Sequence, residues 1–228
     1  MKIEKIGSRN VIFTHTGIDE WNSNLHEIGI EKWNLNLHLI IGQKCNYIID
    51  TGLGSGSIVP IKEYLNGNKN PIVVINTHYD WDHVWGNHCF KESIIISHRL
   101  CRELLEDSWT EMLNEYKQFI RGEVELCLPN MLVGDFLHFP EDKVKIFYTP
   151  GHTIDSISVF DELDNVLNVG DNIGDTIDEI VPRITTDKET YLQSIRTYLD
   201  LNINACISGH NTILGKEIFD KIIKEIRE

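Results

Sequence analysis

Two histidines and two aspartates fall within six residues in the stretch Asn76–Asn87, which is written NTHYDWDHVWGN. They are His78, Asp80, Asp82 and His83. Imidazole nitrogens and carboxylate oxygens are the groups that bind zinc, iron and manganese in proteins. In a locally extended loop, alternate side chains would point to one side and His83 to another, which suits two neighbouring ions better than one. The spacing favours a binuclear metal centre, and a solvated loop without metal is the alternative.

The elements around this stretch are those that would position a site. Pro71–Asn76 contains an unbroken apolar run and predicts a buried strand, while Gly86 offers a place for the chain to turn afterwards. In open α/β sheets, ligands bind in the crevice beyond the carboxyl ends of the strands. We therefore expect the four candidate ligands on the loop that leaves this strand.

The run HYDWDH resembles the HxHxDH motif of the metallo-β-lactamase superfamily, with Asp80 in place of the second histidine. Four further motifs of that family stand in its order along the chain: IIDTG at Ile48–Gly52, TPGHT at Thr149–Thr153, VGD at Val169–Asp171 and SGH at Ser208–His210. The resemblance covers most of the chain, and five ordered motifs are an improbable coincidence.

This resemblance implies a ligand set. One metal would be bound by His78, Asp80 and His152, the other by Asp82, His83 and His210, with Asp171 between the two. Asp50 would support the metal loop without touching metal. The implied cofactors are two divalent metal ions, zinc first, with iron or manganese compatible because of the extra carboxylate of Asp80.

The resemblance also implies an activity: a binuclear metal-dependent hydrolase of a small ester, thioester, lactone or lactam, in which Asp82 orients a metal-bridging hydroxide. The alternative is a non-haem di-iron oxidoreductase related to flavodiiron proteins. These carry a glutamate at the position matching Asp80, but they normally also have a flavodoxin domain, which this sequence lacks. A metal-binding protein without turnover is a third reading, although none of the other family ligand positions is missing.

Length and composition limit the number of domains and the classes of partner. The 228 residues, 41% of them hydrophobic, suffice for one metallo-β-lactamase-like domain over 1–228. A formal net charge of −14 disfavours a nucleic-acid partner. The absence of a signal-like or membrane-length apolar run predicts a soluble, cytoplasmic protein with a small-molecule substrate and no membrane partner. Five cysteines without CxxC spacing indicate neither a disulfide framework nor a cysteine zinc site.

The pattern of short strands and helices predicts the fold class α/β (α+β), and the resemblance implies its architecture: a four-layer αβ/βα sandwich of two mixed β-sheets flanked by helices. Leu35, Leu37 and Leu39 alternate with polar residues, which is typical of a half-buried strand. Other expected strands are Val11–His15, Asn46–Asp50, Ile94–Ser97, Phe136–Phe139, Val144–Tyr148, Ile157–Phe160 and Val166–Val169, and the expected helices include Ser57–Leu65, Glu189–Leu201 and Lys216–Arg227.

Two segments have no counterpart in these motifs. Apolar residues recur at three- and four-residue intervals over Leu100–Ile120, which predicts a helix within a helical insertion at about 99–133. Its apolar stripe fits a cap over the metal site, a homodimer interface or ordinary core packing. The segment Asn22–Asn34, flanked by Trp21 and Trp33, is a second candidate for a loop that reaches the site.

Overall fold

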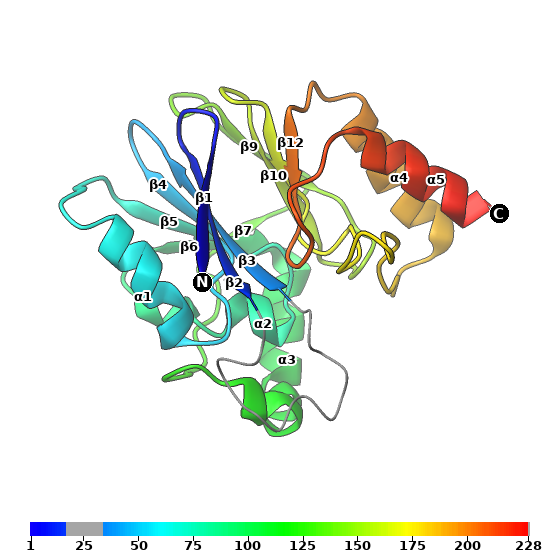
Figure 1. Ribbon diagram of the computed structural model, residues 1–228. Coiled ribbons are helices and arrows are strands. Elements are labelled where there is room, and N and C mark those ends of the chain that lie inside the picture. Colours follow the sequence, from blue (N-terminus) through cyan, green and yellow to red (C-terminus); the bar gives the residue numbers. More distant parts are fainter. Residues whose placement is uncertain (17–33, 228) are drawn as a thin grey trace.

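The computed structural model describes residues 1–16 and 34–227 of the chain (Figure 1). Two β-sheets lie between groups of helices, and the helices α4 and α5 stand on the opposite side of the sheets from α1 (Figure 1). Apart from Asn34, the expected loop at Asn22–Asn34 lies outside the described residues, as do Trp21 and Trp33.

The first sheet has seven strands in sequence order: β1 (Lys2–Ile6), β2 (Asn10–Thr16), β3 (Asn34–Ile41), β4 (Asn46–Ile49), β5 (Ile72–Ile75), β6 (Ile94–His98) and β7 (Met131–Val133). The strands β1 to β4 pair antiparallel, and β4 to β7 pair parallel, so the sheet is mixed. The helix α1 (Ser55–Tyr64) covers its outer face by packing Ile58 and Ile61 against the strands.

The second sheet has five strands in the order β12-β11-β10-β9-β8. They are β8 (Phe136–Phe139), β9 (Val144–Tyr148), β10 (Ile157–Asp161), β11 (Val166–Asn168) and β12 (Ala205–Ile207). Only the pair β11 and β12 is parallel. The helices α4 (Lys188–Leu199) and α5 (Glu217–Arg227) bury an apolar stripe that includes Ile195 and Phe219 against its outer face.

Strand alternation divides the core into layers. On β4, Ile48 packs toward α1, whereas Ile49 packs between the sheets with Ile146 and Ile157 of the second sheet. Helix, sheet, sheet and helix therefore follow one another, which confirms the four-layer αβ/βα sandwich. In the described part of the chain, no helix is long and apolar enough to cross a membrane.

The strand β3 differs from expectation, because both of its faces are buried rather than one. The leucines face the helix layer, and the polar residues between them face the second sheet. There Asn36 donates hydrogen bonds through Nδ2 to the carbonyl oxygens of Ser208 and Asn211, at 2.9 and 2.7 Å. Burial lowers the pKa of His38 to about 3, so its imidazole is neutral. The polar positions thus hold the two sheets together.

The helical part of the expected insertion is shorter than 99–133. The helix α3 (Arg99–Tyr116) continues into the 3₁₀ turn η4 (Lys117–Phe119), but Met131–Val133 forms the strand β7, because β6 offers it a free parallel edge. The stripe of α3 packs Leu105 and Met112 against Val84 and Trp85 beside the metal loop. These contacts favour core packing as the role of the stripe.

Candidate metal centre

The first four candidate ligands follow β5, as expected, but by a different local route. Asp80 is extended and precedes the one-turn helix α2 (Trp81–Val84), in which the His83 N–H donates to the Asp80 carbonyl at 2.9 Å. The expectation of an extended backbone through Asp82 was therefore wrong. The helical turn still directs Asp82 and His83 to one group and leaves His78 and Asp80 in another.

Three further loops bring distant residues to the same edge of the sandwich. His152 follows β9, Asp171 follows β11 and His210 follows β12. The last two loops approach so closely that a Cβ atom on Gly209 would lie 2.2 Å from Asp171 Oδ1. Only glycine fits there, which explains the residue before His210 in the SGH motif.

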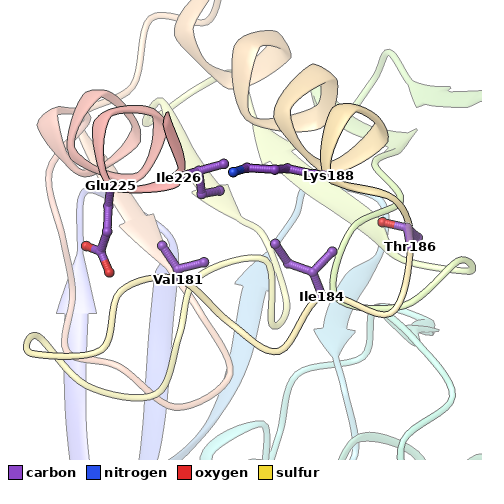
Figure 2. A pocket seen from close by; sticks show the side chains of 6 residues that line it. All are labelled: Val181, Ile184, Thr186, Lys188, Glu225 and Ile226. Atoms are coloured by element: carbon purple, nitrogen blue, oxygen red, sulfur yellow. The ribbon is translucent and has the colours of Figure 1, made fainter. Parts of the chain in front are cut away.

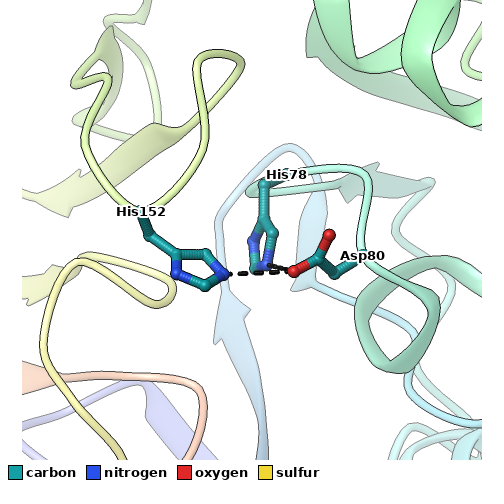
Figure 3. Close-up of side chains that lie close together, drawn as sticks. All are labelled: His78, Asp80 and His152. Carbon is teal, nitrogen blue, oxygen red and sulfur yellow. Dashed lines mark hydrogen bonds and ion pairs between the residues drawn. The ribbon is translucent and has the colours of Figure 1, made fainter. Parts of the chain in front are cut away.

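His78, Asp80 and His152 form the first cluster of ligand atoms (Figure 3). Asp80 Oδ2 lies 3.1 Å from His152 Nε2 and 3.5 Å from His78 Nε2. Burial alone would raise the pKa of Asp80, but the hydrogen bonds with the two imidazoles lower it well below its usual range. Asp80 therefore contributes a carboxylate to this cluster.

Asp82, His83 and His210 form the second cluster. Asp82 Oδ2 lies 3.2 Å from His210 Nε2 and 3.5 Å from His83 Nε2. All three side chains are buried. The sets of three match those that the resemblance implies for the two metals.

Asp171 stands between the clusters. Its Oδ2 atom is 3.7 Å from Nε2 of His78, 3.3 Å from that of His83, 3.9 Å from that of His152 and 3.2 Å from that of His210. One carboxylate oxygen thus faces both histidine rings of each cluster. A carboxylate in this place can bridge two ions, whereas an imidazole cannot.

The donor set fits divalent ions on structural grounds. His78 Nε2, His83 Nε2 and Asp171 Oδ1 are buried without a hydrogen-bond partner among the described residues, although buried polar atoms are nearly always paired. Burial opposes protonation of His83 and His210, yet the Asp171 carboxylate raises both pKa values well above the ordinary range. Positive charge is therefore favoured at this place, and two metal ions would supply it.

The Nδ1 atoms of the histidines determine which nitrogen faces the centre. His83 Nδ1 lies 2.8 Å from Asp50 Oδ2, an acceptor, so the ring donates there. Thr77 donates its hydroxyl to the same carboxylate at 2.8 Å and accepts from His78 Nδ1 at 3.0 Å. In both rings the lone pair is left on Nε2, which points at the cluster. Asp50 supports the metal loop from outside, as expected.

Main-chain carbonyls fix the other two rings in the same way. His210 Nδ1 donates to the Asn34 carbonyl at 2.7 Å, and His152 Nδ1 donates to the Arg183 carbonyl at 2.8 Å. All four imidazoles thus present Nε2 inward and are ready to bind metal as neutral ligands. Neither carbonyl contact could be predicted from the sequence, because a backbone oxygen carries no residue-type signal.

Arg183 belongs to a short segment, Arg183–Thr186, which we call the strap. Thr185 donates to the His152 carbonyl through N at 3.0 Å and through Oγ1 at 2.7 Å. Thr186 Oγ1 donates to the Gly151 carbonyl at 3.0 Å. The strap therefore holds the His152 loop by its main chain as well as by the ring.

The strap also borders a cavity of about 530 Å³ beside α4 and α5 (Figure 2). Its lining residues are Val181, Ile184, Thr186, Lys188, Glu225 and Ile226. Ile184 points into this cavity, toward the helices (Figure 2). Thr185 thus contacts the His152 loop, whereas the neighbouring Ile184 lines the cavity.

Several residues that the sequence left outside the motif have structural roles. His98 caps α3 by accepting from the Leu100 N–H at 3.3 Å and stacks on Tyr148 with ring centroids 4.2 Å apart. Cys206 is fully buried, and burial raises its pKa. Trp81, between two candidate ligands, stacks on Tyr116 of α3 at 4.8 Å, a contact that no motif predicted.

Comparisons with known proteins agree with this geometry. The pattern of the metallo-beta-lactamase superfamily matches residues 33–210. A probable metallo-hydrolase of Methanocaldococcus jannaschii is 30% identical over 176 residues, which are 75% of this chain and 73% of that protein.

Solved structures show the same fold at low sequence identity. A metallo-beta-lactamase from Pontibacter korlensis superposes with a TM-score of 0.72 at 15% identity, covering 100% of this chain and 99% of that one. One from Hirschia baltica gives 0.71 at 16% identity, covering 99% and 96%. Since the family pattern spans most of the sequence and all its motifs meet at one edge of the sandwich, the chain belongs to the metallo-beta-lactamase superfamily.

Proposed function

We propose that this protein is a binuclear metal-dependent hydrolase of a small ester, thioester, lactone or lactam. The observation that carries the proposal is the position of Asp171 Oδ2, within 3.9 Å of the Nε2 atoms of four histidines. The family and the relative named as a probable metallo-hydrolase support the reaction class. Two divalent ions, when bound, would activate a water and act as Lewis acids toward the substrate carbonyl.

Each residue has a distinct task in this proposal. The first ion would be held by the cluster of His78, Asp80 and His152, and the second by that of Asp82, His83 and His210. Asp171 would keep the two sites adjacent. Asp82 has the further task of orienting the attacking water, since its carboxylate can accept a hydrogen bond from it.

The supporting contacts matter for the same reaction. Because Asp50, Thr77 and two backbone carbonyls take the Nδ1 protons, the rings cannot turn to offer the wrong nitrogen. Ligands that are already oriented lose little freedom when metal binds. The site is therefore prepared for metal before metal arrives.

A second candidate, a di-iron oxidoreductase, is favoured by one observation. Asp80 places a third carboxylate among the ligand atoms, and carboxylates favour harder ions such as oxidised iron. The name of the curated relative favours hydrolysis instead.

The test is metal analysis followed by two assays on the same protein. Plasma emission on desalted protein should give close to two ions per chain, and zinc-, manganese- and iron-loaded forms are then offered a panel of esters, thioesters, lactones and lactams. Turnover of at least one substrate class is expected. Catalytic oxygen consumption by the iron form together with silence on the whole panel would support the oxidoreductase.

A further inference from the structure

The residue after the bridging carboxylate, Asn172, holds the loop that carries His152. Its side chain is fully buried, and it lies in the loop that follows β11. Its Oδ1 atom accepts from the His152 main-chain N–H at 2.9 Å, and its Nδ2 atom donates to the Thr149 carbonyl at 2.7 Å. One amide group thus binds both ends of the loop Thr149–His152, and the residue before it is Asp171 itself.

The amide of Asn172 can have only one orientation. A main-chain N–H can only donate and a carbonyl can only accept, so Oδ1 must face His152 and Nδ2 must face Thr149. The second hydrogen of Nδ2 is donated to the Tyr198 hydroxyl at 2.9 Å, and the Tyr191 hydroxyl donates to the Asn172 carbonyl at 2.9 Å. Two tyrosines of α4 therefore fix the residue against that helix.

The amide and the His152 loop are in close contact. A Cβ atom on Gly151 would lie 2.5 Å from Asn172 Oδ1 and 2.5 Å from Tyr191 Cδ2. A side chain at position 151 would therefore push the amide away, and glycine is required for the close approach. Because the contact has no spare room, a displacement of the amide would be passed on to the main chain of the neighbouring His152.

The histidines of the second cluster are held by other groups. His83 donates from Nδ1 to Asp50 at 2.8 Å, and His210 donates from Nδ1 to the Asn34 carbonyl at 2.7 Å. Both acceptors belong to the first sheet or to the loop after one of its strands, whereas Asn172 follows a strand of the second sheet. The two clusters thus depend on different supports.

We propose that Asn172 is a positioning residue for the first metal site, so that the affinity of the first ion depends on its amide and that of the second ion does not. The amide keeps His152 in place relative to Asp171, whose Oδ2 atom lies 3.9 Å from His152 Nε2. Groups that support metal ligands typically change metal affinity by about 10- to 100-fold. This inference rests on the binuclear centre of the proposed function, and its test requires a difference between the two sites.

The experiment measures zinc affinity at each site separately. Metal-free protein is titrated with zinc in competition with a chromophoric chelator, in the background of His210→Ala, which retains the first site, and of His152→Ala, which retains the second. We expect Asn172→Ala to weaken zinc binding by about 10- to 100-fold in the His210→Ala background and to have no effect in the His152→Ala background. A general loss of stability would lower both affinities alike.

Asn10→Ala is the matched control for lost stability. It removes another buried amide that makes three hydrogen bonds. Its partner Asp161 pairs with Val144 at the start of β9, whereas His152 follows the end of that strand. Thermal unfolding of the metal-free protein should show a comparable loss in both variants, while zinc affinity should change only in Asn172→Ala.

Tyr198→Phe is a control beside the site. It removes one partner of the amide but leaves both bonds to the loop, so both zinc affinities should be kept. Asn172→Ser, whose hydroxyl is too short to reach both loop ends, replaces Asn172→Ala if that variant does not fold. An unchanged first site, an equal loss at both sites, or the same loss in either control overturns the inference.

The outcome for the proposed function is separate. Two bound zinc ions without turnover of any ester, thioester, lactone or lactam would contradict the hydrolase and leave the test of Asn172 decisive. A wild-type protein that binds no zinc at the site of His152 would contradict both.

Discussion

Replacing Asp171 should cost the protein both metal ions, whereas replacing Asp82 should cost mainly one. The difference follows from the number of inward imidazole nitrogens that lie close to each carboxylate. Asp171 Oδ2 lies within 3.9 Å of all four inward imidazole nitrogens, while Asp82 lies near those of His83 and His210. Asp171→Ala therefore removes a ligand from both clusters and also the charge that holds them together.

The expected effect of metal on Tm can be worked out from mass action. An ion present at about 100 times its dissociation constant stabilises the folded state by about 2.7 kcal/mol, so two ions contribute about 5.4 kcal/mol. For a protein of this size, 1 kcal/mol corresponds to about 2–4 °C in Tm. Metal should thus raise the wild-type Tm by about 10–20 °C, that of Asp82→Ala by about half as much, and that of Asp171→Ala by almost nothing.

The assay is scanning calorimetry of each protein with metal and after chelation, with metal content from plasma emission on the same samples. Comparing each variant with its own metal-free form removes the direct cost of the substitution. Asp171→Asn is the matched control, because it keeps the side-chain volume and removes the charge. If Asp171→Ala retains two ions, or loses only one while Asp82→Ala loses both, the assignment of the bridge is wrong.

Other expected outcomes test separate parts of the structure. Burial lowers the pKa of His152, but the hydrogen bond to Asp80 outweighs this effect, and the pKa rises from 6.5 to about 9. The protonated ring therefore stabilises the metal-free protein below pH 6.5, and this stabilisation is lost as the pH rises through about 9. Since metal needs the neutral ring, the metal-dependent rise in Tm should grow over the same interval. Asp80→His would raise the charge of a metal-loaded site from about +1 to about +2 and lower the pKa of bound water. A hydrolase should then prefer zinc and shift its pH–rate profile to lower pH, whereas an oxygen-consuming iron form should lose activity. Met112→Ala should destabilise the metal-free protein by about 2–5 kcal/mol in thermal unfolding, because this side chain is buried against the metal loop. Gly209→Ala should lower metal content, since its Cβ would meet Asp171 at 2.2 Å, whereas Gly134→Ala, with nothing within 4 Å, should not.

Local spacing predicted many of the strands and helices and the first four candidate ligands, whereas the other three ligands came from the resemblance to the family. The apolar run before His78 forms the strand β5, and the parallel pairing of β5 with its neighbours places the following loop at the expected edge. The glycine of the last motif marks a loop whose backbone lies close to the side chains of neighbouring ligands, since a Cβ atom on Gly209 would meet Asp171 and His83. Where a position tolerates only one residue type, that residue type itself indicates the local structure.

Burial that depends on distant partners could not be predicted in this way. The alternation of apolar and polar residues in β3 is the same for a strand with one solvent-exposed face and for a strand whose polar side chains contact a second sheet. The contact of Asn36 with Ser208 joins residues 172 positions apart, and nothing near Asn36 in the sequence announces it. The short helix at Asp82 was missed for a related reason, since four residues are too few to show helical periodicity.

The strap illustrates a further limit of prediction from the sequence. His152 is oriented by the carbonyl of a residue 31 positions away, and any amino acid at position 183 would supply the same oxygen. The contact that prepares the metal ligand is therefore independent of the residue type at position 183, so no sequence pattern could predict it. A substitution there should leave the orientation of the ring unchanged. Arg183→Gln is therefore expected to keep the wild-type metal content, which plasma emission on the desalted variant would check, and a loss of metal would show that the side chain matters as well as the carbonyl oxygen.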